Sequence, residues 1–178
     1  MGTSSKELAM KLRKRSRRQQ GCFTASQAIE IGYADSVHLY HVRNGEWIRV
    51  FRGVYRFSDV PETPASRCMA ALLWTRDKNG KIQGFLTPEA AAALRDGTLR
   101  AETPIPIAAP KGFRRSSAPP PGIQLIYGAD RDHKTSKMGG LPVQAPPVGA
   151  PPGVPPDLDA PDYYDWLDYQ AVLCATPS

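Results

Sequence analysis

One stretch decides the fold of this chain: residues 24–57, which read TASQAIEIGYADSVHLYHVRNGEWIRVFRGVYRF. It opens with Thr24-Ala25-Ser26-Gln27, and this S/T-x-x-E/Q pattern is typical of the capping box that begins a helix. We therefore predict a helix over residues 25–31. Gly32 follows it, at a position where glycine commonly ends a helix in the left-handed conformation.

A second helix follows almost at once. Only two residues separate Gly32 from Asp35, a favoured N-cap residue, and the pattern predicts a helix over residues 35–44 that Gly45 ends. Two short helices joined by a tight glycine-containing turn are typical of a helix-turn-helix. Residues 5–20 contain neither glycine nor proline and predict one more helix ahead of this pair.

Two runs rich in aromatic and β-branched residues come next, residues 46–51 and 54–57. The Arg52-Gly53 break between them predicts a β-hairpin. The predicted core residues of the hairpin are Trp47, Val54 and Tyr55. Helix, helix-turn-helix and hairpin in this order predict a winged helix, with the hairpin as its wing, in a DNA-binding domain of residues 1–60.

The rest of the chain predicts a small α/β domain over residues 61–141 and a tail over residues 142–178. Helices are expected at residues 65–75 and 88–95, and strands at residues 82–86, 105–108 and 123–127. The tail begins with a Pro- and Gly-rich linker, residues 142–156, and then favours a short acidic amphipathic helix. The predicted class is α+β: a winged helix-turn-helix, a small α/β domain and a Pro-rich acidic tail.

Charge is divided unevenly along the chain. All 23 lysines and arginines lie at or before Lys137 with 12 of the 17 acidic residues, which gives residues 1–137 a net charge of +11. Residues 138–178 carry five aspartates and no basic residue, a net charge of −5. A basic body indicates a polyanionic partner. For the tail we hypothesise docking on the basic face or on a partner protein, which would weaken non-specific DNA binding; a solubilising tail is the alternative.

Several function classes find no support. The three cysteines are far apart, and the sequence has no P-loop, G-x-S-x-G, H-E-x-x-H or dinucleotide-binding motif. The start has no apolar signal segment, and the longest apolar run, residues 68–74, is too short to cross a membrane. We expect a cytoplasmic binding protein without metal, cofactor, enzymatic activity or membrane contact.

Three segments carry a resemblance to a known family: residues 21–28 (GCFTASQA), 43–50 (RNGEWIRV) and 52–56 (RGVYR). They resemble the N-terminal domain of AbiEi-type antitoxins, which belong to bacterial type IV toxin–antitoxin systems. Residues 106–115 (PIAAPKGFRR) look like the strand and basic loop of the domain that follows in that family. Past Val143, where the family continues with a helical segment, this chain has a proline-rich run.

The resemblance implies a transcriptional regulator that binds double-stranded operator DNA and represses its own toxin–antitoxin operon. It also implies a nucleotidyltransferase-like toxin as partner. The alternatives are a winged-helix protein–protein adaptor and an RNA-binding module without a toxin partner. The sequence leaves the operator, the toxin and the oligomeric state open.

In a helix-turn-helix the second helix lies in the major groove, where side chains meet base edges. Its polar residues are the predicted base contacts: Ser36, His38, Tyr40, His41 and Arg43. We expect Arg43 and His41 to contribute most. The residues expected to face inward are Val37, Leu39 and Val42. The two histidines could instead be partly buried or surface groups; as metal ligands they lack an obvious third partner.

Contacts to the DNA backbone are predicted at three places. The basic first helix offers Lys14, Arg15, Arg17 and Arg18. The helix start offers Thr24, Ser26 and Gln27, although capping alone would account for Thr24. The wing offers Arg49, Arg52 and Arg56. A second basic loop, with Lys111, Arg114 and Arg115, is a candidate for a phosphate or an acidic partner; simple solvation is the alternative.

Overall fold

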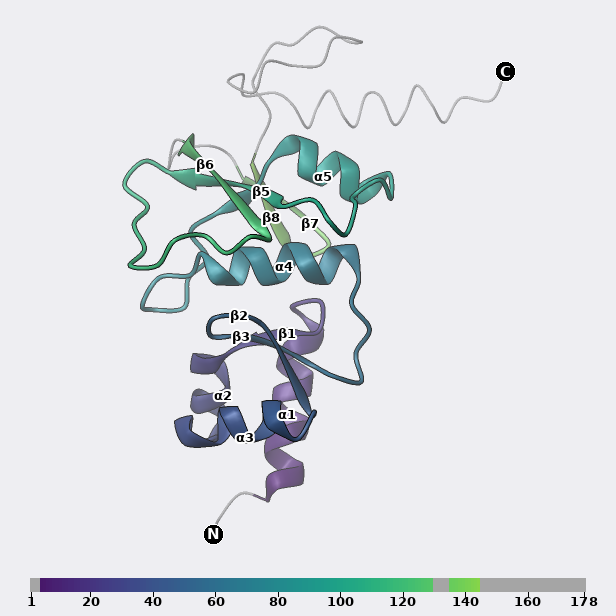
Figure 1. The fold of residues 1–178 in the computed structure, drawn as a ribbon, viewed down its shortest axis with the longest axis vertical. Coiled ribbons are helices and arrows are strands. Elements are labelled where there is room, and N and C mark those ends of the chain that lie inside the picture. The colour runs from purple at the N-terminus through teal and green to yellow at the C-terminus, as the bar shows by residue number, and fades with distance from the viewer. Residues whose placement is uncertain (1–3, 130–134, 145–178) are drawn as a thin grey trace, which may run out of the picture.

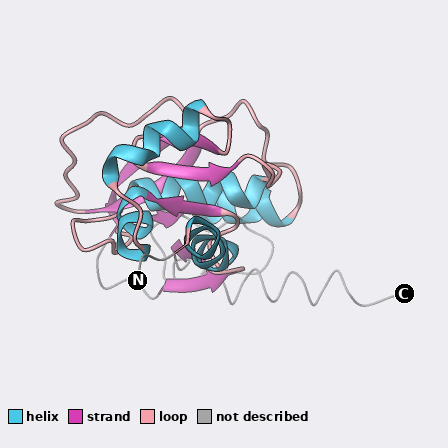
Figure 2. Cartoon of the chain, turned by 90° about the horizontal axis from the view of Figure 1, so that it is seen from below, coloured by secondary structure: helices cyan, strands magenta, loops and turns pink. Residues whose placement is uncertain are grey.

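The computed structural model describes residues 4–129 and 135–144, in which helices and strands are mixed along the chain (Figures 1 and 2). The N-terminal elements are α1 (Ser5–Arg17), β1 (Cys22–Thr24), α2 (Ala25–Ile31), a 3₁₀ turn (Asp35–Val37), α3 (His38–Arg43), β2 (Trp47–Phe51) and β3 (Val54–Phe57). The elements that follow are α4 (Pro64–Trp74), β4 (Phe85–Leu86), α5 (Pro88–Arg95), β5 (Ile105–Pro110), β6 (Ile123–Ala129), β7 (Thr135–Met138) and β8 (Leu141–Gln144). The fold is therefore α+β and begins with a winged helix.

Helix α2 begins and ends where the sequence predicts. The Thr24 side chain accepts a hydrogen bond from the Gln27 amide at 3.2 Å, and the Gln27 side chain accepts one from the Thr24 amide at 3.0 Å. These two bonds form the predicted capping box. At the other end Gly32 has a φ of 123°, which glycine adopts without strain. The capping signals alone therefore locate this helix.

The predicted helix over residues 35–44 is wrong in its first turn. Residues Asp35–Val37 form a 3₁₀ turn, and the α-helix begins only at His38. Asp35 makes no capping hydrogen bond, because its carboxylate lies instead 3.5 Å from Nδ1 of His38. The tighter turn is common at the start of an α-helix.

Helix α1 also ends earlier than predicted, at Arg17 rather than near residue 20. The chain reverses there: Gln20 and Gly21 have φ values of 55° and 84°. A Cβ atom on Gly21 would lie 2.7 Å from a methyl carbon of Val60, so only glycine fits this turn. The reversal leads directly into β1, a strand that the sequence does not predict.

The first sheet has the strand order β1-β3-β2, with both pairs antiparallel. One face packs on α1, α2 and α3 through an aromatic cluster. Its buried members are Leu12, Phe23, Ala28, Tyr33, Trp47, Tyr55 and Phe57. Alternate residues of a strand point to opposite faces, so Cys22 and Val54 face the other way and belong to the core around α4. Both faces of this small sheet are therefore covered.

Helix α4 lies between the two sheets, with the hairpin below it and the second sheet above it in Figure 1. All its residues from Cys68 to Trp74 are buried. The second sheet has the order β6-β5-β4-β8-β7, and its other face is covered by α5 (Figure 1). The core around α4 therefore joins the winged helix to the second sheet through Cys22 and Val54, and the aromatic cluster forms a second core on the other face of the first sheet.

The second region differs from its prediction in three ways. Of the strand expected at residues 82–86, only β4 forms, because residues 77–83 make a turn held by the Asp77 side chain. Strands β7 and β8 were not predicted. Strand β8 continues to Gln144, so the predicted linker does not begin at Pro142; both of its neighbours in the sheet pair with it. The predicted acidic helix of the tail lies outside the described residues.

Candidate nucleic-acid interface

Helix α3 has one buried and one exposed face. His38 is 4% exposed, and Val37 and Val42 pack on the aromatic cluster. The residues that point to solvent are Ser36, Leu39, Tyr40 and Arg43. Their spacing of three and four residues puts them on one side of the helix. Leu39 is 57% exposed, which contradicts its predicted inward position and adds an apolar group to this outward face.

His38 is not available to a base edge, which corrects its prediction as a base contact. Its ring lies against Trp47 and Tyr55, with centroids 5.6 Å and 5.9 Å away. The pKa of His38 is below its ordinary value because burial disfavours the charged ring; Asp35 opposes this shift and His41 adds to it. The structure therefore makes His38 a core residue of the domain.

His41 is held by its neighbours as well. Its ring stacks on Trp47 at 4.5 Å with an interplanar angle of 20°. Its Nδ1 lies 2.5 Å from a carboxylate oxygen of Glu46, and the side chain is 14% exposed. The His41 ring therefore packs on the core side of α3. This position does not fit the leading base-reading role that the sequence predicts for it. Arg43 remains the outward cation of the helix.

Strand β2 follows α3 directly, contacts it and forms the edge of the first sheet. Arg49 on this strand and Arg52 at the hairpin turn are exposed. Arg49 thus lies on the strand that contacts α3, and Arg52 lies at the far end of the same strand, beside the end of α4. We call this combined surface the α3–β2 face; its residues are Ser36, Leu39, Tyr40, Arg43, Arg49 and Arg52.

The turn of the wing is not a free tip. Arg76, at the end of α4, donates hydrogen bonds to the carbonyl oxygens of Gly53 at 3.0 Å and Leu73 at 2.9 Å. Gly53 leaves the room for this guanidinium, since a Cβ there would lie 2.7 Å from Nη2 of Arg76. Gly53 therefore lets the Arg76 side chain approach the backbone of the turn closely. Nothing in the sequence pattern singles out Arg76.

Three predicted backbone contacts are engaged inside the protein. Arg56 is buried, donates to the carbonyl oxygen of Val60 and lies 3.6 Å from Glu62. The side chains of Thr24 and Gln27 form the capping box, and Gln27 also bonds Gln19. Their predicted roles as phosphate contacts are therefore corrected. Ser26 alone of that helix start is exposed.

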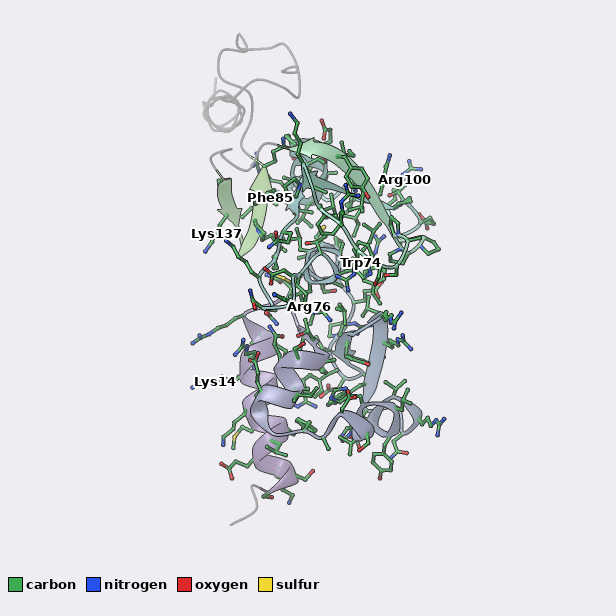
Figure 3. All side chains as sticks on the ribbon, turned by 90° about the vertical axis from the view of Figure 1, so that its left-hand side faces the viewer. Lys14, Trp74, Arg76, Phe85, Arg100 and Lys137 are labelled. Carbon is green, nitrogen blue, oxygen red and sulfur yellow. The ribbon has the colours of Figure 1, made fainter. Side chains whose placement is uncertain are left out.

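The cations of α1 lie on a different side of the domain. Leu12 points into the core, and a residue two positions on lies about 200° around the helix, so Lys14 points directly away from it. Figure 3 shows Lys14 on the side opposite to α3. The structure therefore does not bring Lys14, Arg15, Arg17 and Arg18 together with the α3–β2 face.

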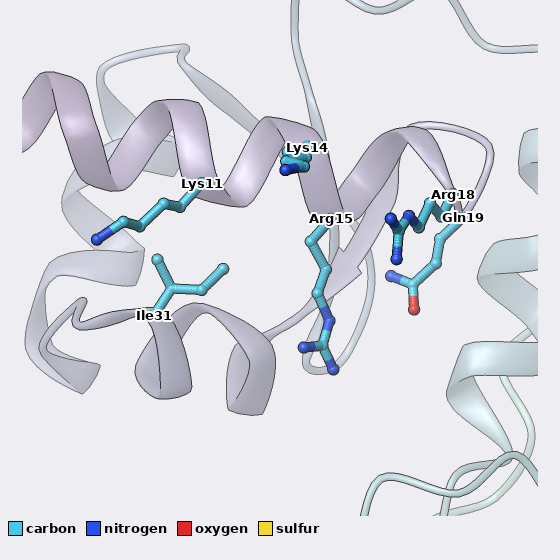
Figure 4. A pocket seen from close by; sticks show the side chains of 6 residues that line it. All are labelled: Lys11, Lys14, Arg15, Arg18, Gln19 and Ile31. Carbon is cyan, nitrogen blue, oxygen red and sulfur yellow. The ribbon is translucent and has the colours of Figure 1, made fainter.

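Between α1 and α2 runs a groove of about 540 Å³, shown in Figure 4. Its lining is mainly cationic: Lys11, Lys14, Arg15 and Arg18, with Gln19 and Ile31. We call it the α1–α2 groove. Glu7 pairs with Lys11 at 2.9 Å and Glu30 with Arg15 at 3.5 Å, both at half-exposed positions. Within residues 4–129 and 135–144, no carboxylate pairs with Lys14 or Arg18.

The three cations of the second basic loop differ in their exposure to solvent. Lys111 and Arg114 are exposed, as a phosphate or partner contact requires. Arg115 instead folds back: its guanidinium lies 4.6 Å from the centre of the Trp74 ring and donates to the Trp74 carbonyl oxygen. It covers the end of α4, which corrects its predicted exposure to a partner.

Metal-binding clusters and membrane-spanning helices are both absent from the part of the chain that the structure describes. No group of three or more histidine, cysteine, aspartate or glutamate side chains there is arranged to hold a metal ion. No helix in the same residues has the length and hydropathy to cross a membrane.

Comparison with protein families identifies the part of the chain that carries the α3–β2 face. Residues 10–58 match the family model described as "Transcriptional regulator, AbiEi antitoxin". The match runs from the middle of α1 to the end of β3 and thus covers the helix-turn-helix and the wing. No curated protein matches the chain. By this match, the N-terminal winged helix of the chain is similar to the AbiEi antitoxin family of transcriptional regulators.

Proposed function

We propose that this protein is a DNA-binding repressor of its own operon and that the α3–β2 face is its DNA-binding surface. The observation that carries the proposal is the outward face formed by α3 and the 3₁₀ turn before it. Its four side chains make no hydrogen bond or ion pair with other described residues, and they include the cation Arg43. A helix of this kind fits the major groove of B-DNA. A regulator of this type works in the bacterial cytoplasm.

Base reading would rest on three of these residues. Arg43 can donate two hydrogen bonds to a guanine edge, and such a pair discriminates against the wrong base by about 1–3 kcal/mol. Leu39 and Tyr40 offer apolar surface, which fits the C5 methyl group of thymine. The proposed site therefore contains a G·C pair next to A·T pairs.

The wing side of the surface would hold the phosphate backbone. Arg49 and Arg52 are exposed on the edge strand and at its turn. Contacts from such side chains position a protein on the duplex without reading its sequence. Because Arg76 fixes the turn, these two arginines would meet the DNA at a constant distance from α3.

The finer part of the proposal concerns the operon. We infer antitoxin-like autorepression with a nucleotidyltransferase-like toxin as partner; the family match of residues 10–58 supports it. We place the DNA-binding domain at residues 1–60. The exposed Lys111 and Arg114 are the groups of the second domain that we assign to the acidic surface of a partner.

Fluorescence anisotropy with the DNA upstream of the gene tests the proposal. The protein should bind this duplex more tightly than a scrambled duplex of equal length, and both affinities should fall as salt rises, because binding releases counterions. Equal and weak binding to both duplexes would refute operator recognition and favour an adaptor. Preference for RNA of the same sequence would favour the RNA-binding alternative.

A further inference from the structure

The α1–α2 groove is a second charged surface that the proposed operator contact does not use. It lies along α1, whose outward cation Lys14 is on the side of the domain opposite to α3 (Figure 3). A straight duplex seated on the α3–β2 face would leave the groove exposed. Any ligand of the groove would therefore be different from the operator DNA.

We propose that the acidic tail of this same chain, residues 157–168, binds in the α1–α2 groove. The charges of the tail and of the groove are complementary. Residues 145–178 contain five aspartates and no lysine or arginine, and all five lie between Asp157 and Asp168. Four cations line the groove, and two of them, Lys14 and Arg18, have no carboxylate partner within the described residues.

The last described strands of the chain lie near the groove. The turn between β7 and β8 touches the turn that follows α1, where the Gln20 side chain donates to the carbonyl oxygen of Gly139 at 3.0 Å. Gly140 lies against the backbone of Arg18, a residue that lines the groove. The described chain ends at Gln144, the last residue of β8 and four residues beyond this turn.

The segment between Gln144 and Asp157 is long enough to span the distance to the groove. A strand advances about 3.3 Å per residue, so Gln144 is about 13 Å from the turn that contacts α1. From Gln144 to Asp157 the chain can span at most about 45 Å. The groove begins beside that turn, well within this reach. A short tether keeps the local concentration of the acidic segment near the groove high, even where each ion pair is weak.

The groove also offers an apolar wall. Ile31 lines it opposite the cations (Figure 4), and the tail has Leu158 and Trp166 among its aspartates. An occupied groove would be closed to other polyanions. The consequence is that non-specific nucleic acid is excluded from α1 while the α3–β2 face stays available.

A zero-length carbodiimide cross-link tests the contact directly in the full chain. The reagent joins a carboxylate to a lysine amine only when the two are in contact. At low protein concentration and low salt, mass spectrometry should find the tail aspartates joined to Lys11 and Lys14 within single chains. Lys78 and Lys81 are the matched controls, since both are exposed lysines that do not line the groove. The groove cross-links should fall several-fold in 0.5 M salt, because exposed charge pairs are screened.

Cross-links spread equally over Lys78 and Lys81, or formed only between two chains, would overturn the proposal. A second measurement uses binding to a scrambled duplex. Replacing the five aspartates by asparagine should raise the affinity at least five-fold in the native background. In a Lys14→Gln, Arg18→Gln background the same replacement should change it less than two-fold. An equal gain in both backgrounds would show a general charge effect and would also overturn the proposal, whether or not the operator is recognised.

Discussion

Arg76 joins the winged helix to the rest of the molecule, and its replacement by methionine measures how much this link stabilises the fold. Methionine keeps an unbranched apolar stem but removes the guanidinium group and its two hydrogen bonds to the carbonyl oxygens of Gly53 and Leu73. A hydrogen bond from a charged donor contributes about 1.5–3 kcal/mol, so the gross loss is about 3–6 kcal/mol.

Two effects reduce this loss. Both carbonyl groups keep another donor, the Ala25 amide for Gly53 and the Arg76 amide for Leu73. The substitution also removes a charge that its surroundings disfavour: burial and the nearby Arg115 lower the pKa of Arg76. We therefore expect a net loss of about 2 kcal/mol, which corresponds to about 4–8 °C in Tm for a protein of this size.

Thermal and urea unfolding of Arg76→Met measure the stability, and hydrogen exchange of the amides over residues 50–54 reports on the turn. The control is Arg95→Met, an exposed position at the end of α5. The turn amides should exchange faster in Arg76→Met only. Equal Tm values for the two variants, with unchanged exchange at the turn, would refute the idea that Arg76 holds the wing in place.

Three further predictions follow from burial and exposure. Burial raises the pKa of Cys22 to about 12 and that of Cys68 to about 11, so iodoacetamide at pH 8 should leave both unmodified in the folded protein; rapid labelling would contradict their burial. Burial lowers the pKa of His38, so the folded state binds its proton less readily than the unfolded chain. Urea unfolding should therefore show stability lost as pH falls through the ordinary value of 6.5, and the loss should shrink in His38→Gln; an identical pH dependence would refute it. Replacing operator thymines by deoxyuridine should weaken binding of the native protein but not of Leu39→Ala, as measured by anisotropy; equal sensitivity of both would exclude Leu39 as the methyl contact.

Local signals in the sequence were sufficient for much of the N-terminal fold. The capping box and Gly32 located α2, and the Arg52-Gly53 break located the hairpin. The core predicted for the hairpin is also confirmed, since Trp47 and Tyr55 are buried in the aromatic cluster. These features depend on neighbours in the sequence, which explains why a single sequence reveals them.

The errors concern contacts between distant residues. Strand β1 has only three residues, too few to show the alternating pattern that predicts a strand, and it forms because it pairs with β3. Strands β7 and β8 were missed for the same reason. The assignment of His38 and Leu39 was reversed because the 3₁₀ turn shifts the phase of α3, and an aromatic cluster can accept a neutral imidazole in place of a leucine.

The same limit applies to the candidate site. Cations could be found by residue type, but which of them point to solvent depends on tertiary partners such as Val60 for Arg56 and Trp74 for Arg115. The residues that remain on the α3–β2 face are those without such partners. Arg76 escaped prediction because its role depends on the position of a glycine 23 residues earlier in the chain.

The most direct test of operator reading by α3 is the ratio of affinities for the upstream duplex and a scrambled duplex. Arg43→Ala should reduce this ratio by about five-fold or more, since one base-specific pair carries about 1–3 kcal/mol. Arg52→Ala should weaken both duplexes alike and leave the ratio unchanged. An unchanged ratio in Arg43→Ala, with native folding shown by its Tm, would contradict the account and show that α3 does not read the operator through Arg43.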